Sequence, residues 1–209
     1  MLFDYSGTLF RLNEDDGWFA GMGLDTAQRA DVMDRMTHPT AEVTHQAWAH
    51  RDLDPDLHRE AYLHVLQDCG LPDEHARALY ERVIDPAWWT PYPDTAAVLN
   101  GLRARGIVTA VVSNIAWDIR RSFDGLQADP DEFVLSFEVG AVKPDPRIFT
   151  AALSRLGVDA ADSLMVGDSE ENDGGALALG CAFALVDPLH TEDRPTGLID
   201  ALREHGVDL

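Results

Sequence analysis

Four short polar segments of this chain carry the side chains that could do chemistry. In chain order they contain Asp4, Ser113, Lys143 and Asp168, and Lys143 is the only lysine among 209 residues, beside fifteen arginines. A lysine ammonium is a compact point charge, whereas an arginine is a wide planar fork, so a site that neutralises a crowded oxygen can require lysine. A carboxylate can act as a nucleophile or hold a hard cation such as Mg²⁺. The combination indicates a site where positive charge balances carboxylates around an anion.

Each polar segment follows an apolar run that is typical of a buried strand. The runs lie at residues 1–3, 107–112, 134–137 and 164–166, with a fifth at 182–186. Helical patterns alternate with them at 95–105 and 146–156, and Asp145 can cap the second helix while Gly157 ends it. This alternation predicts an α/β fold, a Rossmann-like parallel sheet with helices on both faces. Loops at the carboxyl ends of such strands meet at one edge of the sheet.

Residues 12–90 show a different pattern, with helical stripes and no convincing strand. One stripe runs through 57–69 and another through 76–84, and prolines at 91 and 93 separate them from the helical pattern at 95–105. We therefore predict a helical cap domain at 12–90, inserted into an α/β core formed by 1–11 and 91–209.

Only three residues precede Asp4, fewer than the usual strand of about five to six. The first strand is therefore expected to be truncated or to begin upstream of Met1.

The order of these segments resembles the motifs of the haloacid dehalogenase superfamily over essentially the whole sequence. The first motif of that family has Asp, any residue, usually Asp, then Gly-Thr, and it matches the string from Asp4 to Thr8. The second motif matches Ser113, the third matches Lys143, and the acidic fourth matches the run from 167 to 173. The helical insertion is similar to the small cap of the family's C1 branch.

The resemblance implies a Mg²⁺-dependent phosphatase that forms an aspartyl-phosphate at Asp4. Carboxylate, carbonyl and water oxygens suit Mg²⁺, and a glycine permits the tight backbone turn that lets amide groups face an anion. Asp173 could instead cap the helix after it. The candidate residues are catalytic Asp4, Ser113 and Lys143, substrate-binding Ser6, Gly7 and Asn114, and the Mg²⁺ ligands Asp4, Ser6 (through its carbonyl), Asp168 and Asp173.

Ser6 departs from the family pattern, which usually has a second aspartate two residues after the nucleophile. That aspartate protonates the leaving oxygen and then activates water, whereas a hydroxyl is a poor general acid or base near neutral pH. Two alternatives therefore stay open. One is a 2-haloacid dehalogenase-like hydrolase, which needs no metal and in which Arg11 could bind a substrate carboxylate. The other is a catalytically impaired binding or regulatory protein. A phosphonatase is disfavoured, because Lys143 leaves no second lysine for a Schiff base.

The composition narrows the range of partners. With 37 acidic and 16 basic residues the net charge is −21, which disfavours nucleic acid and anionic membranes as partners. This charge would also repel a small anionic substrate at long range, so local positive charge or a metal must attract the substrate. No apolar run could span a membrane and the first residues do not resemble a signal peptide, so a cytoplasmic protein is expected. Cys69 and Cys181 are expected to be reduced core residues. Candidate pocket walls, which could equally be core, are Trp18, Phe19, Trp48, Trp88 and Trp89.

Overall fold

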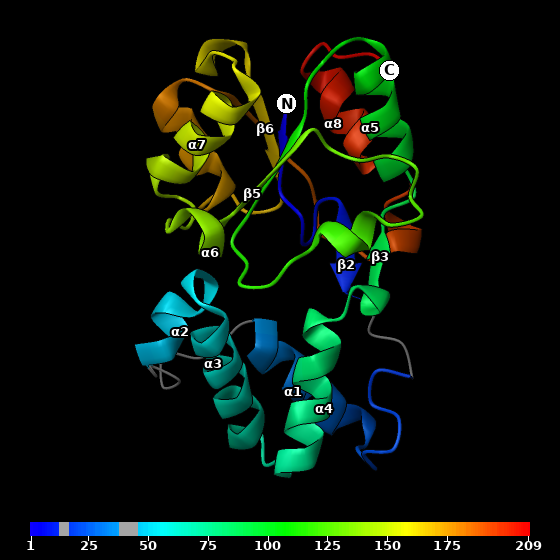
Figure 1. Ribbon diagram of the computed structural model, residues 1–209. Coiled ribbons are helices and arrows are strands. Elements are labelled where there is room, and N and C mark those ends of the chain that lie inside the picture. Colours follow the sequence, from blue (N-terminus) through cyan, green and yellow to red (C-terminus); the bar gives the residue numbers. More distant parts are fainter. Residues whose placement is uncertain (13–16, 38–45) are drawn as a thin grey trace.

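A parallel sheet of five strands forms the centre of the upper half of the molecule in Figure 1, a computed structural model that describes residues 1–12, 17–37 and 46–209. The strands are β1 (Leu2–Phe3), β4 (Ala110–Ser113), β5 (Glu132–Leu135), β6 (Leu164–Gly167) and β7 (Ala182–Leu185). Their order across the sheet is β5-β4-β1-β6-β7, and all neighbours run parallel. The α/β fold expected from the sequence is therefore confirmed.

Helices cover both faces of the sheet. On one face lie α5 (Thr95–Ala104) and α8 (Gly197–Glu204), and on the other lies α7 (Pro146–Leu156), as the two sides of Figure 1 show. Each face buries its own apolar cluster, because strands covered on both sides alternate side chains between two cores. Leu102 and Leu202 belong to the first cluster, and Ile148 and Phe149 to the second. The short α6 (Ser136–Val139) directly follows β5.

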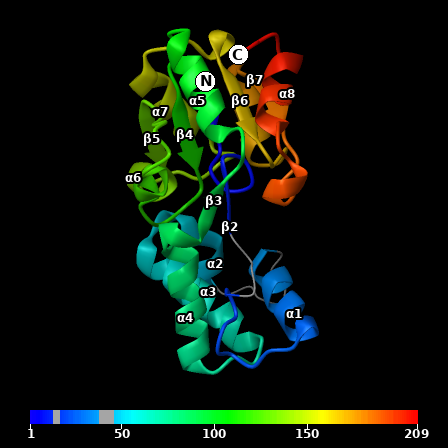
Figure 2. The same cartoon turned by 90° about the vertical axis from the view of Figure 1, so that its right-hand side faces the viewer.

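Four further helices form the lower half of the molecule (Figures 1 and 2). They are α1 (Thr26–Thr37), α2 (Gln46–His50), α3 (Pro55–Asp68) and α4 (Asp73–Ile84). They enclose a separate apolar cluster that includes the fully buried Trp18 and the nearly buried Phe19. These two aromatic residues are therefore core residues of the helical unit. None of the helices in the described ranges is long and apolar enough to cross a membrane.

Two short strands join the helical unit to the sheet domain. β2 (Phe10–Leu12) and β3 (Trp89–Pro91) pair antiparallel, and both views show them between the halves. The sequence did not predict this pair, because three-residue strands are too short to show alternation. Short 3-10 helices complete the structure at Arg51–Leu53, Pro86–Trp88, Arg120–Phe123, Ala160–Asp162, Asp173–Leu179 and Thr191–Asp193.

Two predicted strands have different bounds in the structure. The run at 107–112 becomes a strand only from Ala110, because the amide of Thr109 donates to the Asp131 side chain instead of to a neighbouring strand. The run at 134–137 ends as a strand at Leu135, and Ser136 begins α6, where its hydroxyl accepts from the amide of Ile115. The first strand has only two residues, yet it pairs with both β4 and β6 at the centre of the sheet.

Candidate active site

The candidate residues come from the carboxyl ends of three adjacent central strands. Asp4 directly follows β1, Ser113 is the last residue of β4, and Asp168 directly follows β6. The register aligns Phe3 with Val111 on one side and with Val166 on the other, and the amide of Asp4 donates to the carbonyl of Val166 at 2.9 Å. The parallel register therefore brings these three side chains to one edge of the sheet.

Lys143 lies at the centre of this edge, with only 4% of its surface exposed. Its Nζ donates to Oδ1 of Asp4 at 2.6 Å and to Oδ1 of Asp173 at 2.6 Å. The side chain of Asn114 holds the lysine backbone, since its Nδ2 donates to the Lys143 carbonyl at 3.0 Å and its Oδ1 accepts from the Lys143 amide at 2.6 Å. The only ammonium side chain in the sequence is therefore buried between two carboxylates.

Asp173 is completely buried and uses both of its oxygens. Oδ1 accepts from Lys143, and Oδ2 accepts from the amide of Ser169 at 3.0 Å. The carboxylate fits only because position 167 is glycine: a Cβ on Gly167 would lie 2.1 Å from Oδ2 of Asp173. The helix-cap interpretation of Asp173 is wrong, because Asn172 occupies the cap position and no side chain there caps the helix. Asp173 instead fixes Lys143 and the loop after β6.

Asp168 packs against the loop after Asp4. Gly7 has a φ of +75°, and a Cβ at this position would lie 2.2 Å from Oδ2 of Asp168. Glycine is required here both for the backbone conformation and for the close approach of the carboxylate. Ser6 is exposed, and its backbone forms a bridge with Phe10.

Three carboxylates of this site could hold one cation. Asp4, Asp168 and Asp173 each offer an oxygen, and these three oxygens lie within 4.8 Å of one another. Carboxylate oxygens are the ligands that Mg²⁺ prefers, and like charges at this spacing repel one another unless a cation lies between them. The donor set therefore fits a hard divalent cation.

Burial shapes the acidity of the site. It raises the pKa of Asp4 to about 7, since the loss of water outweighs the attraction of Lys143. Burial, followed by the charge of Asp173, raises the pKa of Asp168 to about 6. Burial alone would lower the pKa of Lys143, but Asp4 and Asp173 together raise it above its ordinary value. Lys143 thus stays charged, while two of the carboxyls hold a proton more tightly than in water.

The other residues that the sequence singled out, Ser113, Arg11 and three tryptophans, lie in different parts of the structure. Ser113 is buried at the end of β4. Arg11 donates from Nη1 to the carbonyl of Pro188 at 2.7 Å, so this contact ties it to the loop after β7. Trp89 packs on Tyr5, with ring centroids 4.9 Å apart, and Trp88 packs edge-on against Trp18 in the helical unit. Trp48 packs against Tyr62 and under the guanidinium of Arg51.

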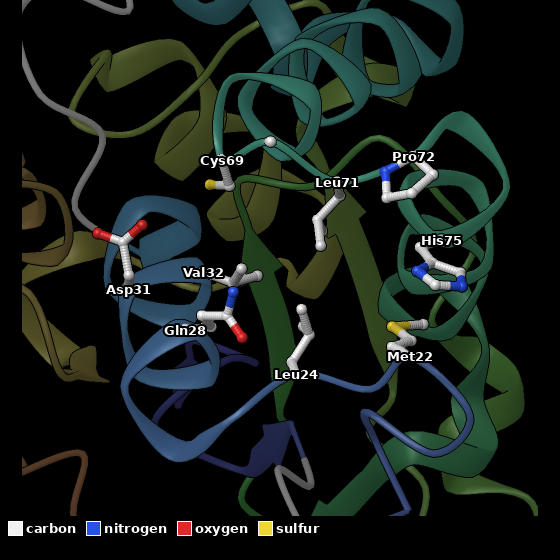
Figure 3. Close-up of a pocket in the computed structure, with 10 residues that line it drawn as sticks. Met22, Leu24, Gln28, Asp31, Val32, Cys69, Leu71, Pro72 and His75 are labelled. Carbon is white, nitrogen blue, oxygen red and sulfur yellow. The ribbon is translucent and has the colours of Figure 1, made fainter.

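Two cavities lie away from the carboxylates and Lys143. One, of about 160 Å³, lies between α1 and the turn that joins α3 to α4 (Figure 3). It is lined mainly by apolar side chains, and Gln28, Asp31 and His75 are the polar ones. The other is a cleft of about 500 Å³ beside β3, where Trp89 and Arg121 are among the lining residues. Of the five candidate aromatic walls, Trp89 alone lines either of these two cavities.

Two residues near the site, Asp52 and Arg194, could not be identified from the sequence. Asp52, in the helical unit, accepts from the Ser136 hydroxyl through its carbonyl. Burial raises the pKa of its carboxyl to about 6, although the charges of Arg51 and Lys143 counteract this. Arg194, in the loop before α8, donates to the carbonyls of Gly7 and Thr8. Neither residue belongs to a motif, because its neighbours in the sequence are unrelated to its neighbours in space.

Comparisons with known proteins agree with this architecture. The family model described as haloacid dehalogenase-like hydrolase matches residues 1–180. The mouse haloacid dehalogenase-like hydrolase domain-containing protein 3 is 38% identical over 61% of the chain and 54% of its own length. Phosphoserine phosphatase of Thermus thermophilus is 34% identical over 67% of the chain and 60% of its own length. The chain thus spans less than two thirds of either relative.

A solved structure gives the same picture of the fold. A defluorinating L-2-haloacid dehalogenase superposes with a TM-score of 0.68, covering 91% of this chain and 82% of its own, at 20% identity. At that identity the similarity concerns the fold alone.

Proposed function

The chain belongs to the haloacid dehalogenase-like hydrolases, and we propose that it is a Mg²⁺-dependent phosphatase that acts on a small phosphorylated molecule through Asp4. The observation that carries the proposal is the cluster of Asp4, Asp168 and Asp173 around Lys143, with carboxylate oxygens within 4.8 Å of one another. Lys143 balances one of the three negative charges, and a divalent cation would balance the other two. Phosphatases are also present among the relatives.

The residues present fit Mg²⁺ by number, type and spacing of oxygens. Asp4 and Asp168 would be side-chain ligands, with the backbone carbonyl of Ser6 and an oxygen of Asp173 as further candidates. When bound, Mg²⁺ would neutralise the phosphoryl group and so reduce its repulsion from the attacking carboxylate.

The reaction proceeds by two displacements at phosphorus. An oxygen of Asp4 attacks the phosphorus atom, the bond to the leaving oxygen breaks with its electron pair, and that oxygen takes up a proton. Water then attacks the phosphorus of the aspartyl-phosphate, loses a proton, and releases phosphate and the Asp4 carboxylate. Lys143 lies 2.6 Å from Asp4 and offsets negative charge at both steps.

Substrate contacts would come from the residues around Asp4. The Ser113 hydroxyl and the Ser6 hydroxyl would donate hydrogen bonds to phosphoryl oxygens. The amide of Gly7, which the sequence suggested as a further substrate contact, donates instead to the carbonyl of Phe10 at 2.8 Å. Asn114, which the sequence suggested as a direct contact, pairs with the Lys143 backbone, so its contribution includes holding the ammonium in place.

Ser6 determines which substrates react well. A hydroxyl has no useful pKa near neutrality, so proton transfer to the leaving oxygen is poorly assisted. Substrates with an acidic leaving group, such as acyl or aryl phosphates, need little assistance. They are therefore favoured over alkyl phosphates.

The helical unit at 12–90 is proposed as a C1-type cap over the core formed by 1–11 and 91–209, and substrate selection is assigned to it. The net charge of −21 argues against nucleic acid and membrane as partners. A small anionic substrate is proposed because of the local positive charge of Lys143 and the proposed cation. A cytoplasmic location is part of the same proposal.

The test is a panel of aryl, acyl and alkyl phosphates and 2-haloacids, assayed with Mg²⁺ and with EDTA. Phosphate release that requires Mg²⁺ and is lost in Asp4→Asn supports the proposal. Metal-independent halide release would replace it with the dehalogenase alternative. If phosphorylated ligands bind but neither product forms, the protein is a binding member of the family.

A further inference from the structure

Arg194 contacts residues 5–9, the loop that follows the proposed nucleophile Asp4 and is called the nucleophile loop below. It belongs to the segment between β7 and α8, outside residues 1–180 that match the family model. Only 5% of its surface is exposed. A buried arginine is rare unless its donors are used, because desolvating the charge is costly. Its surroundings therefore indicate what it does.

The guanidinium donates to the nucleophile loop. Nη1 donates to the carbonyl of Gly7 at 2.7 Å and to that of Asp187 at 3.0 Å, and Nη2 donates to the carbonyl of Thr8. Its Cζ lies 3.1 Å from the centroid of the Tyr92 ring. The planar fork of arginine holds its donors in a fixed geometry while it stacks on an aromatic ring, whereas the ammonium of lysine is a point charge on a flexible stem.

The segment that carries Arg194 is itself held in place. The Tyr92 hydroxyl donates to the carbonyl of Leu189 at 2.8 Å, and Arg11 donates to that of Pro188. With the bond from Arg194 to Asp187, three consecutive carbonyls are fixed. Gly197 makes room for the arginine, since a Cβ there would lie 2.6 Å from its Cγ.

The nucleophile loop tolerates little displacement. Gly7 packs so closely against Asp168 that a Cβ would lie 2.2 Å from its Oδ2, and the same Cβ would lie 3.1 Å from Pro188. A shift of the Gly7 or Thr8 peptide would therefore move Asp168 as well as the turn after Asp4. The two carbonyls that Arg194 holds belong to these peptides.

We propose that Arg194 is a positioning residue for the reaction at Asp4. It holds the peptides of Gly7 and Thr8 from behind, and it thereby keeps the turn after Asp4 against Asp168. The catalytic consequence rests on the proposed function, whereas the fixing of the loop does not.

The test uses Arg194→Lys, which keeps the charge, and Arg194→Met, which removes it. The matched control is Arg203→Lys on α8, where an exposed arginine pairs with Asp200 at 2.7 Å. Backbone hydrogen exchange of the Leu9 and Phe10 amides, which donate to the Tyr5 carbonyl, should accelerate at least tenfold in both Arg194 variants. For an aryl phosphate, kcat should fall at least tenfold in both variants, with KM changed less than threefold. The control should match the wild type in both respects.

Exchange rates near wild type in Arg194→Lys would overturn the proposal, because charge alone would then suffice. A measurement on the wild type alone needs no variant. Its Leu9 and Phe10 amides should exchange as slowly as the amides of β4. Fast exchange of these two amides would also overturn the proposal. If the wild type hydrolyses no phosphate, the proposed function fails while the exchange results still decide whether Arg194 holds the loop.

Discussion

Replacing Asp4 with asparagine should stabilise the metal-free protein at alkaline pH while it removes activity. Asp4 is 6% exposed and close to two other carboxylates, so its ionised form is unfavourable in the folded state. Burial raises its pKa to about 7 from the ordinary 3.8. The folded state therefore binds a proton that the unfolded chain has released, and this proton is lost as pH rises through about 7.

The size of the effect follows from the pKa difference. A carboxyl whose pKa rises from 3.8 in the unfolded chain to about 7 in the folded state corresponds to about 4 kcal/mol. That stability is fully present below pH 3.8 and is lost as pH rises through about 7. Between about pH 5 and about pH 8 the wild type should lose about 3 kcal/mol that Asp4→Asn retains, because the asparagine amide does not ionise.

Urea unfolding of both proteins in EDTA at about pH 5, 6.5 and 8 measures this difference. The stability gap in favour of Asp4→Asn should widen steadily with pH, whereas the exposed Asp129→Asn should show no such trend. Mg²⁺ at about a hundred times its Kd should stabilise the wild type by about 2.7 kcal/mol at about pH 8 and Asp4→Asn much less. A gap that is equal at the lowest and the highest pH would refute the electrostatic reasoning.

Three further substitutions test the site. Lys143→Arg should reduce kcat/KM for an aryl phosphate by about 10²-fold or more, nearly as much as Lys143→Ala, because the fork does not fit between two carboxylates; retention of half the activity would contradict this. Ser6→Asp should raise alkyl-phosphate hydrolysis by up to about 10²–10⁴ with little change for aryl phosphates, and an equal gain for both classes would argue against a general-acid role. Gly167→Ala should lower the free energy of unfolding, measured in urea, by about 1–3 kcal/mol, because the new Cβ would lie 2.1 Å from Oδ2 of Asp173. The control Gly174→Ala should not lower it, because a Cβ there would have no neighbour closer than 3.9 Å.

Much of the fold could be predicted because strand and helix periodicity are local signals. Residues 164–166 and 182–186 are apolar runs of strand length between helical patterns, and both are strands with nearly the predicted bounds. The pairing of β2 with β3 could not be predicted, because it joins residues about eighty positions apart through three-residue strands. The early end of β5 depends on the Ser136 hydroxyl, whose partner Ile115 lies on another loop.

Part of the candidate site could likewise be predicted from the sequence, and part could not. Asp4, Lys143 and Asp168 occupy fixed places relative to strands, so their convergence follows from parallel topology. The second bond of Lys143, to Asp173, depends on the path of the loop after β6, and the sequence left that residue as either a ligand or a cap. Arg194 contacts Gly7 across 187 positions, and nothing in its neighbourhood of acidic residues and proline indicates this.

Because the whole chain is negatively charged, the site must supply the positive charge that attracts an anionic substrate. The net charge of −21 repels an anionic substrate at long range, and within the site three carboxylates face one ammonium, which leaves two negative charges unbalanced when all are ionised. A divalent cation would balance those two charges, and only then would Lys143 be able to attract a phosphoryl oxygen in addition to its carboxylate partners. Burial is the main cause of the raised pKa values of Asp4 and Asp168, and the negative charge of Asp173 raises both further. The spacing of the carboxylates is thus unfavourable for the protein alone and favourable for a protein that holds a cation there, and this is the physical reason to prefer a metal-dependent phosphatase over a metal-independent hydrolase.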